Sequence, residues 1–510
     1  LEVNNSNLSV VSATQAALNI AGESPKLILD SSSVNITSTS GQRINLIGAN
    51  PLVSLVSTEM IMNASNGRGI YLQGATPQVL MENSQLLMTD TGASQGMILQ
   101  GTDALLSLSN QSEFSITGAG TGALENIQIG NNNARPKLLI EDSSKLLINT
   151  SSSNSVPSLS SSNQIHVRGA GANVTIQSNA TLMTVNTLGW QTGLRVTGTN
   201  SLVTVNSGNI YTENSNLFFT DVKSVLFENN STIDLFMNRR FRTPTTNSSH
   251  LDGYSSLIYI DSQDIEVNIL KQSVLKIEND FGQAITTNID TFAMPIIKFL
   301  IDDSELDISG GTEQTTLLVI QANEIEFVIR NQAIVNMENI GTSVVRPSSW
   351  NAPNVLSLYA AGRNPNINFQ VENSLLNLQS DNGVPLYFVN RAGSSGTHLV
   401  NVLVKDGSTF QTISQKNYAI AYHLGESPEV DCGIFEINNP LFYEIESGSN
   451  LPAIEVLGVP SNVNMSMIGE NTKLALWRKS ESRPELPDFS YSSNFNFEVS
   501  GVGGLNTVIK

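Results

Sequence analysis

Short runs of alternating apolar and polar residues recur along the first two hundred positions of the chain, and each run ends in glycine. The runs resemble one another, as Ile44-Asn45-Leu46-Ile47 and Ile70-Tyr71-Leu72-Gln73 show. Strict alternation over a few residues is typical of a β-strand with one buried face. The closing glycines are Gly22, Gly48, Gly74, Gly101, Gly130, Gly169 and Gly198. A recurrence of roughly 20 to 50 residues built from strands and turns predicts a solenoid, because one such unit cannot bury its apolar side alone.

A polar corner and two further strands complete the repeating unit. Pro25, Pro51 and Pro77 follow the first three glycines, and an apolar run, a polar corner and a second alternating run come next. The corners read Glu82-Asn83-Ser84, Glu141-Asp142-Ser143, Asp302-Asp303-Ser304 and Glu372-Asn373-Ser374. Asn and Asp tolerate positive φ, and the side chains of Asn, Asp and Ser bond to nearby backbone, so these residues suit tight corners. A third connection of variable length closes each unit.

Three strands and three connections per unit predict a triangular parallel β-helix, in which each strand pairs with its copy one coil along, ~4.8 Å away. The second half of the chain keeps this plan, with first-strand runs such as Leu356–Tyr359 and Ile420–His423. We therefore predict an all-β fold, a right-handed parallel β-helix of about fifteen three-stranded coils, because right-handed crossovers dominate between parallel strands. We expect a single domain over residues 1–510, with a C-terminal cap at about 473–510.

Charge and apolar content argue against two classes of partner. A formal net charge of −19 disfavours nucleic acid, which needs a concentrated basic surface. No apolar run is long enough to insert into a membrane, and no signal peptide is recognisable, so we expect a mature or excised fragment. The single cysteine, Cys432, is predicted to be a buried structural thiol. Cysteine poverty fits either the cytoplasm or an extracellular protein that is stabilised by stacking.

The repeat pattern and two closing stretches, Lys473–Lys479 and Asn494–Gly501, resemble the pectate-lyase-like adhesive domain of large surface proteins of Gram-positive enterococci, listeriae and lactobacilli. The resemblance covers essentially the whole chain and consists of scaffold motifs. It implies a right-handed β-helix, export to the cell surface and an adhesive role. No Leu-Pro-x-Thr-Gly sorting signal and no Trp-x-Leu pair occurs, so any anchoring segment is expected outside this fragment.

The outward positions of the first strand and its preceding third connection are the expected binding surface, since polysaccharide usually lies on this face of the related fold. The side chains there are mostly amide, hydroxyl and aromatic, and they include Tyr71. His166 and Arg168 project from one strand and Arg195 from the next, which predicts a small basic patch. A hydrogen-bonded solvent face is the alternative interpretation.

Third connections supply further candidates for binding. Trp190 and Trp350 lie in connections that lead into this face and would stack on sugar rings, or else cover the strands beneath them. The longest connection contains Arg239, Arg240, Phe241, Arg242 and Tyr254, which suit an acidic glycan or polymer. The alternative for this segment is a solvated loop tip.

The sequence assigns no catalytic or metal-binding residue. A calcium-dependent lyase needs converging carboxylates, and a glycoside hydrolase needs two carboxyl groups ~5 to 9.5 Å apart. Asp261 and Glu455 lie several coils apart, although a loop acid such as Asp252 is free to approach Asp261. We expect no cofactor, with calcium at the Asp/Asn corners left open.

These observations favour a monomeric, non-enzymatic adhesin located extracellularly, at the bacterial cell surface or cell wall. Its expected partner is a glycan or a component of host extracellular matrix or mucus. One alternative is a polysaccharide lyase or glycoside hydrolase of β-helix fold, and another is a structural stalk.

Overall fold

The fold is described from a computed structural model of residues 1–510. The described residues are 1–13, 16–38, 43–64, 68–90, 95–118, 125–131, 135–151, 163–189, 191–237, 256–279, 282–287, 296–310, 316–341, 354–362, 365–392, 399–424, 429–438, 440–447, 454–457, 462–470, 476–478, 489–490 and 494–500. Every regular element within them is a β-strand, which confirms the all-β prediction. No helix in these ranges is long and apolar enough to span a membrane.

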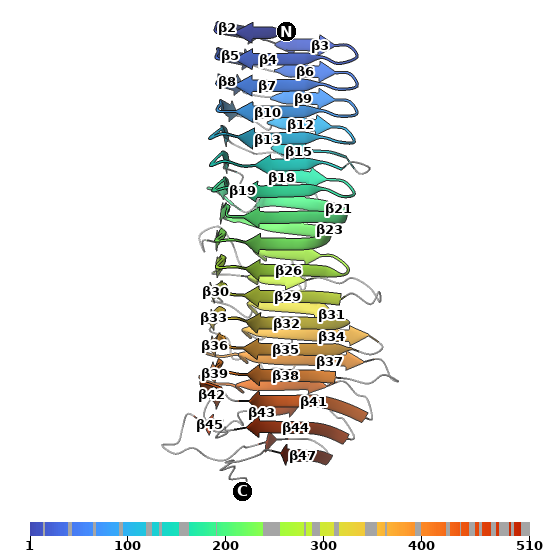
Figure 1. The fold of residues 1–510 in the computed structure, drawn as a ribbon, viewed down its shortest axis with the longest axis vertical. Helices are drawn as coiled ribbons and strands as arrows, with labels where there is room; N and C mark the ends of the chain where they lie inside the picture. Colours follow the sequence, from blue (N-terminus) through green and yellow to red (C-terminus); the bar gives the residue numbers. More distant parts are fainter. Residues whose placement is uncertain are drawn as a thin grey trace. The chain divides into compact units, whose positions relative to one another are not determined.

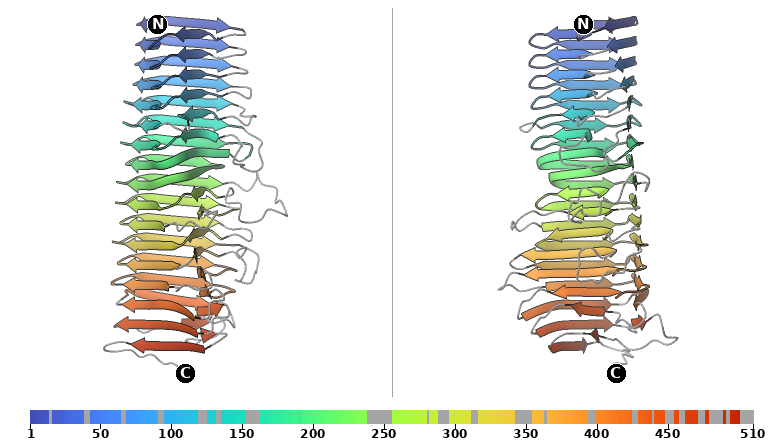
Figure 2. Two further views of the ribbon diagram at one scale, coloured as in Figure 1. Left: turned by 90° about the vertical axis from the view of Figure 1, so that its right-hand side faces the viewer. Right: turned by 180° about the vertical axis from the view of Figure 1, so that it is seen from behind.

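The chain divides into two compact units, Leu1–Thr245 and Thr246–Lys510, and each is a parallel β-helix. Three stacks of parallel strands, named A, B and C in chain order, form each unit (Figure 1). The chain passes along A, turns at the polar corner into B, follows the third connection into C, and returns through the glycine corner to A. Figures 1 and 2 show that this path winds right-handed, as predicted.

In the first unit, stack A contains β1 (Glu2–Asn4), β4 (Lys26–Asp30), β7 (Leu52–Val56), β10 (Gln78–Glu82), β13 (Leu105–Ser109), β16 (Lys137–Ile140) and β19 (Asn173–Gln177). Stack B contains β2 (Asn7–Ser12), β5 (Ser33–Ser38), β8 (Glu59–Ala64), β11 (Gln85–Asp90), β14 (Glu113–Gly118), β17 (Lys145–Thr150), β20 (Thr181–Asn186), β22 (Asn209–Glu213) and β24 (Thr232–Met237). Stack C contains β3 (Leu18–Ala21), β6 (Ile44–Ile47), β9 (Ile70–Gln73), β12 (Met97–Gln100), β15 (Ile127–Ile129) and β18 (Asn163–Arg168). Two long strands, β21 (Gln191–Asn206) and β23 (Ser215–Glu228), pair first in C and then in A.

In the second unit, stack A contains β26 (Ile265–Leu270), β29 (Ile296–Asp302), β32 (Glu324–Arg330), β35 (Asn366–Glu372), β38 (Leu399–Lys405), β41 (Glu429–Asn438), β44 (Asn462–Glu470) and β47 (Asn494–Ser500). Stack B contains β27 (Val274–Asn279), β30 (Glu305–Gly310), β33 (Ile334–Asn339), β36 (Leu375–Ser380), β39 (Thr409–Ser414), β42 (Phe442–Ser447) and β45 (Leu476–Arg478). Stack C contains β25 (Ile258–Asp261), β28 (Ile285–Thr287), β31 (Leu318–Ala322), β34 (Leu356–Gly362), β37 (Leu386–Ala392), β40 (Ile420–Leu424), β43 (Ile454–Leu457) and β46 (Phe489–Ser490). In the stretch predicted to be a cap, β47 still pairs in parallel with β44, so coil pairing extends to Ser500.

The glycine corner between stacks C and A explains the most regular feature of the sequence. A Cβ added to Gly48 would lie 1.9 Å from the carbonyl oxygen of Gly22 and 2.6 Å from Cδ of Pro25. A Cβ added to Gly74 would lie 1.9 Å from the carbonyl oxygen of Gly48. Successive coils thus stack backbone on backbone at this corner and leave no room for a side chain.

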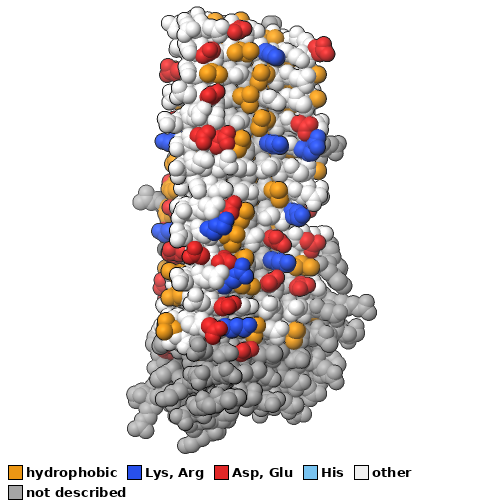
Figure 3. Space-filling view, in the orientation of Figure 1, with side chains coloured by type: hydrophobic (Ala, Val, Ile, Leu, Met, Phe, Trp, Pro, Cys, Tyr) orange, Lys and Arg blue, Asp and Glu red, His pale blue; other side chains and the backbone are white. Residues whose placement is uncertain are grey.

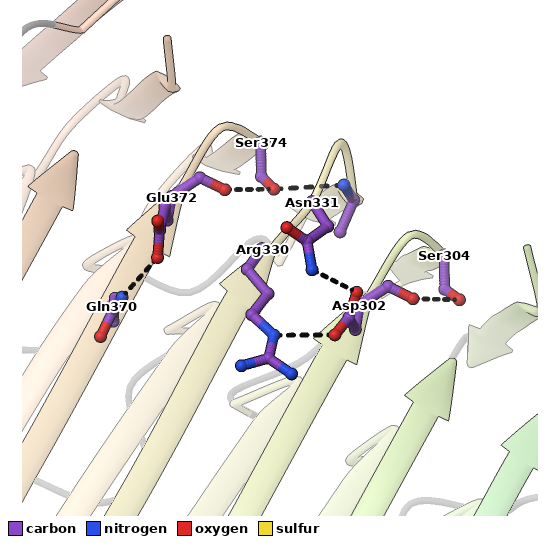
Figure 4. Close-up of polar contacts among 8 residues, drawn as sticks. Asp302, Ser304, Arg330, Asn331, Gln370, Glu372 and Ser374 are labelled. Carbon is purple, nitrogen blue, oxygen red and sulfur yellow. Dashed lines mark hydrogen bonds and ion pairs between the residues drawn. The ribbon is translucent and has the colours of Figure 1, made fainter. Parts of the chain in front are cut away.

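The polar corner between stacks A and B depends on a buried serine. Asn83 adopts φ 47°, and the Ser84 hydroxyl donates a hydrogen bond of 2.7 Å to the Glu82 carbonyl. The same oxygen accepts the Thr58 backbone N–H of the neighbouring coil at 3.0 Å. Figure 4 shows the equivalent serines of the second unit, where the Ser374 hydroxyl donates to the Glu372 carbonyl at 2.8 Å. Each serine therefore closes its own corner and fixes the next coil.

One predicted corner differs from the sequence interpretation. At Glu141-Asp142-Ser143, both Asp142 and Ser143 adopt positive φ, 53° and 60°. The corner is one residue longer than expected, and Ser144 is the fully buried serine that accepts the Ser112 N–H at 3.1 Å.

Matching side chains lie above one another in the core of each unit. Leu72 is fully buried, as its inward assignment predicts. Phe327 stacks on Phe299 with ring centroids 5.2 Å apart and on Phe369 at 5.6 Å. Variation in length is concentrated in the third connection, which ranges from Asn214 alone, between β22 and β23, to residues 238–257, between β24 and β25.

Candidate functional site

Four of the predicted binding residues fall within the described ranges: Tyr71, His166, Arg168 and Arg195. They all lie on the outer surface of stack C in the first unit. The other predicted residues, Trp190, Trp350, Arg239, Arg240, Arg242 and Tyr254, lie outside the described residues.

A column of side chains runs along this surface in parallel register, and we call it the outer C column. Its members are Asn19, Asn45, Tyr71, Ile98, Gln128, His166, Arg195 and Phe218. The Asn45 amide donates to the Asn19 side-chain oxygen at 2.8 Å, which forms one step of an amide ladder. Strand register thus brings together residues that lie far apart in the sequence.

Tyr71 is held within the protein and is only 9% exposed. Its hydroxyl lies 2.9 Å from Oε1 of Gln100 and 3.1 Å from Oε1 of Gln73. The Arg68 guanidinium lies 5.0 Å from the ring centroid, and its Nε donates to Gln95 at 3.1 Å. The surface offered to a ligand here therefore consists of the exposed Gln73 and Gln100, while the Tyr71 ring supports them.

His166 is the centre of the most constrained polar cluster on this face. Its Nδ1 lies 2.5 Å from Oε1 of Glu125, and its Nε2 lies 2.9 Å from Oγ1 of Thr197. The Asn163 amide also donates to Oε1 of Glu125, at 3.3 Å. Glu125 precedes β15, His166 lies within β18 and Thr197 lies within β21, so three successive coils contribute to the cluster.

Burial sets the protonation state of this cluster. It lowers the pKa of His166, and the charges of Arg195 and Arg168 act in the same direction, against the raising effect of Glu125. Burial alone would raise the pKa of Glu125, but the hydrogen bond and charge of His166, with Asn163 and Arg168, bring this pKa below its ordinary value. At neutral pH the ring is therefore neutral and Glu125 is a carboxylate. Nδ1–H donates to Glu125, and Nε2 accepts the Thr197 hydroxyl proton.

Four residues of this region are neighbours on the adjacent strands β18 and β21. His166 pairs laterally with Arg195, and Arg168 with Thr197. The Arg195 guanidinium lies 4.9 Å from the ring centroid of Phe218 in the next coil. Within the described ranges, the Arg168 side chain has no ion pair. We call these four residues, with Glu125 and Asn163, the His166 cluster.

The predicted basic residues lie together in the cluster, but the sequence did not indicate its other three members, Glu125, Asn163 and Thr197. Glu125 adds a carboxylate beneath His166, and Thr197 adds a hydroxyl beside Arg168. Glu125 lies just before a stack C strand, opposite Asn163 of the next coil. Because Glu125 lies outside the strand, alternation does not assign it to the outer face, and only the register between coils brings it to His166.

Acidic residues at the polar corners have structural partners. Asp302 accepts hydrogen bonds from Arg330 Nε at 2.7 Å and from the Asn331 amide at 2.8 Å (Figure 4). Asp302, Arg330, Glu372 and Lys405 follow one another in register, so acid and base alternate along stack A. Figure 3, which views stack A from outside, shows acidic and basic side chains interspersed. Within the described ranges, no group of three or more His, Cys, Asp or Glu side chains is arranged to hold a metal ion.

Stack C of the second unit has an aromatic outer surface. The Tyr387 hydroxyl lies 2.8 Å from Nδ1 of His423. Tyr359 and Tyr418 pack against an apolar cluster that contains Tyr387 and Val389. Tyr387 itself is only 4% exposed, so the partly buried Tyr359 and Tyr418 present the accessible aromatic edges.

Comparison of the chain with family models, with curated proteins and with solved structures gave no match.

Proposed function

We propose that the protein is an extracellular adhesin, which binds a glycan or a component of host matrix or mucus through stack C and its third connections. Binding itself involves no chemical turnover. The resemblance to bacterial surface adhesive domains supports this proposal. The same resemblance supports a location at the cell surface or cell wall, which is part of the proposal.

The outer C column of the first unit is the observation that carries the proposal. Neighbouring members are one strand spacing apart, ~4.8 Å, so a linear polymer that lies along the column meets one of its side chains at each coil. Asn19 of the column and Gln73 and Gln100, two residues further along their strands, are exposed and offer amides to sugar hydroxyls. Arg195 of the column and Arg168 beside it are partly exposed and offer guanidinium groups. A rigid backbone presents these groups already ordered, so binding orders few side chains further.

A glycan array probed with the whole chain tests the proposal, with product analysis on every ligand that binds. Gln73→Ala combined with Gln100→Ala should weaken binding. Gln78→Ala, a matched change on the outer face of stack A, should leave binding unchanged. The third connections are tested by Trp190→Ala with Trp350→Ala, which we expect to reduce affinity.

Two outcomes would contradict the adhesin. New reducing or unsaturated ends on the bound polymer would indicate a lyase or hydrolase. Silence toward all glycans and matrix components, together with unchanged polymer, would indicate a structural stalk.

A further inference from the structure

Glu125, His166 and Thr197 have the arrangement of an activated hydroxyl nucleophile. In such sites a base lies within hydrogen-bond reach of the hydroxyl, and a third group orients the base. Nε2 of His166 lies 2.9 Å from Thr197 Oγ1, and Nδ1 lies 2.5 Å from Glu125. The acid, base and hydroxyl therefore form one continuous chain of hydrogen bonds.

The neutral ring has the tautomer that this chemistry needs. Because Glu125 accepts the proton of Nδ1, the lone pair of Nε2 faces the Thr197 hydroxyl. Asn163 donates to the same carboxylate oxygen at 3.3 Å, which helps to hold the acid in place. Each member of the chain thus has a fixed hydrogen-bonding role.

The base of the cluster is buried, whereas the hydroxyl and the two arginines are partly exposed. His166 is 5% exposed, whereas Thr197, Arg168 and Arg195 are partly exposed. Arg168 lies beside Thr197 on the neighbouring strand, and Arg195 lies two residues before Thr197 on the same face. Two arginines are therefore neighbours of Thr197 in the strands, and a guanidinium is a group that can stabilise a developing oxyanion.

We propose that Thr197 is the nucleophile of an acyl-transfer site that acts on short-chain carboxylic esters. Oγ1 attacks the ester carbonyl carbon while its proton passes to Nε2 of His166. The carbon–oxygen bond to the leaving group then breaks, and the leaving alkoxide takes that proton and departs as an alcohol. Water attacks the acyl-Thr197 and gives its proton to Nε2. The acid is released, and Oγ1 recovers its proton from Nε2.

The next coil contains an internal control. Phe218 and Thr220 occupy the register positions of Arg195 and Thr197. Thr220 therefore supplies a hydroxyl on the same face, one coil along. The residue two positions before it is Phe218, whereas Arg195 stands two positions before Thr197. Its removal should not affect the reaction.

The test uses the whole chain with p-nitrophenyl acetate as substrate and a fluorophosphonate probe followed by peptide mass spectrometry. Wild-type protein should hydrolyse the ester and carry the probe on Thr197. Thr197→Val should remove the adduct and lower the rate about 100-fold or more, while Thr197→Ser should retain both. Thr220→Val should behave as wild type.

His166→Gln gives an independent measurement, because it should lower the rate about 100-fold without removing the hydroxyl. The wild-type rate should fall on acidification as His166 is protonated, with a midpoint below pH 6.5. The charged groups that influence His166 are Glu125, Arg168 and Arg195. Circular dichroism confirms that each variant is folded. An adduct at another residue, no adduct at all, or wild-type hydrolysis by folded Thr197→Val would overturn the proposal. Failure here leaves glycan binding untouched, so the two proposals are separable.

Discussion

Ser84→Ala tests the hydrogen bonds that the buried serines of the polar corners form between coils, which we call the serine ladder. Ser84 accepts the Thr58 N–H at 3.0 Å and donates to the Glu82 carbonyl at 2.7 Å. Alanine keeps Cβ and removes only the hydroxyl, so no large cavity forms. The change therefore tests hydrogen bonding between coils rather than packing.

The size of the effect on stability depends on which hydrogen bonds the two former partners of the Ser84 hydroxyl keep after the substitution. The Glu82 carbonyl still accepts the Ser57 N–H at 2.9 Å, so it stays satisfied. The Thr58 N–H loses the hydroxyl that it reaches in a buried corner. An unsatisfied buried donor costs about 1–3 kcal/mol, which is the expected decrease in the free energy of unfolding.

Hydrogen exchange is the suitable assay, because coils of a solenoid open locally and a single global transition is not assured. Protection of the Thr58 amide should fall about 5-fold to 150-fold, the equilibrium factor for that energy. Ser107→Ala, on the outer surface of β13, serves as the matched control and should leave protection unchanged. Equal effects of the two substitutions, or none at Ser84, would refute the ladder.

Three further predictions concern the glycine corner, the His166 cluster and the core. Gly48→Ala should unfold neighbouring coils, since its Cβ would meet the Gly22 carbonyl oxygen at 1.9 Å; thermal melting equal to wild type would contradict this. Acidification should reduce the stability advantage of wild type over His166→Gln, because the lowered pKa values of His166 and Glu125 mean that the unfolded state binds more protons. The loss begins near the ordinary histidine value of 6.5 and continues below it, and urea unfolding that gives a pH-independent difference would refute it. Leu72→Asp should also unfold adjacent coils, because it buries a carboxylate without a partner, and an unchanged melting temperature would show the inward assignment to be wrong.

The scaffold could be predicted because its determinants are local and repeated. Gly48 and Asn83 each occupy a backbone position that few residues tolerate, so their recurrence marks the coil period directly. Strand alternation then assigns the inner and outer faces, and the burial of Leu72 confirms this for stack C.

The remaining details depend on contacts between coils, which a single period does not contain. The longer corner that ends at Ser144 could not be distinguished from a three-residue corner by composition alone. Glu125 is 41 residues from His166 and lies outside any strand, so only register brings the two together. The hydrogen bond of the Tyr71 hydroxyl to Gln100 also joins two coils, so a single period does not indicate it.

Register between coils is the premise on which both proposed sites depend, and cysteine cross-linking measures it most directly. Ser54 pairs with Leu80, which pairs in turn with Ser107. After Cys432 is replaced by alanine, Ser54→Cys with Leu80→Cys should form a disulfide on mild oxidation, because adjacent strands bring Cα atoms within the range of 4.4–6.8 Å that the bond requires. Ser54→Cys with Ser107→Cys should not, because two strand spacings separate them. Cross-linking of the second pair in preference to the first would contradict the stacked-coil architecture.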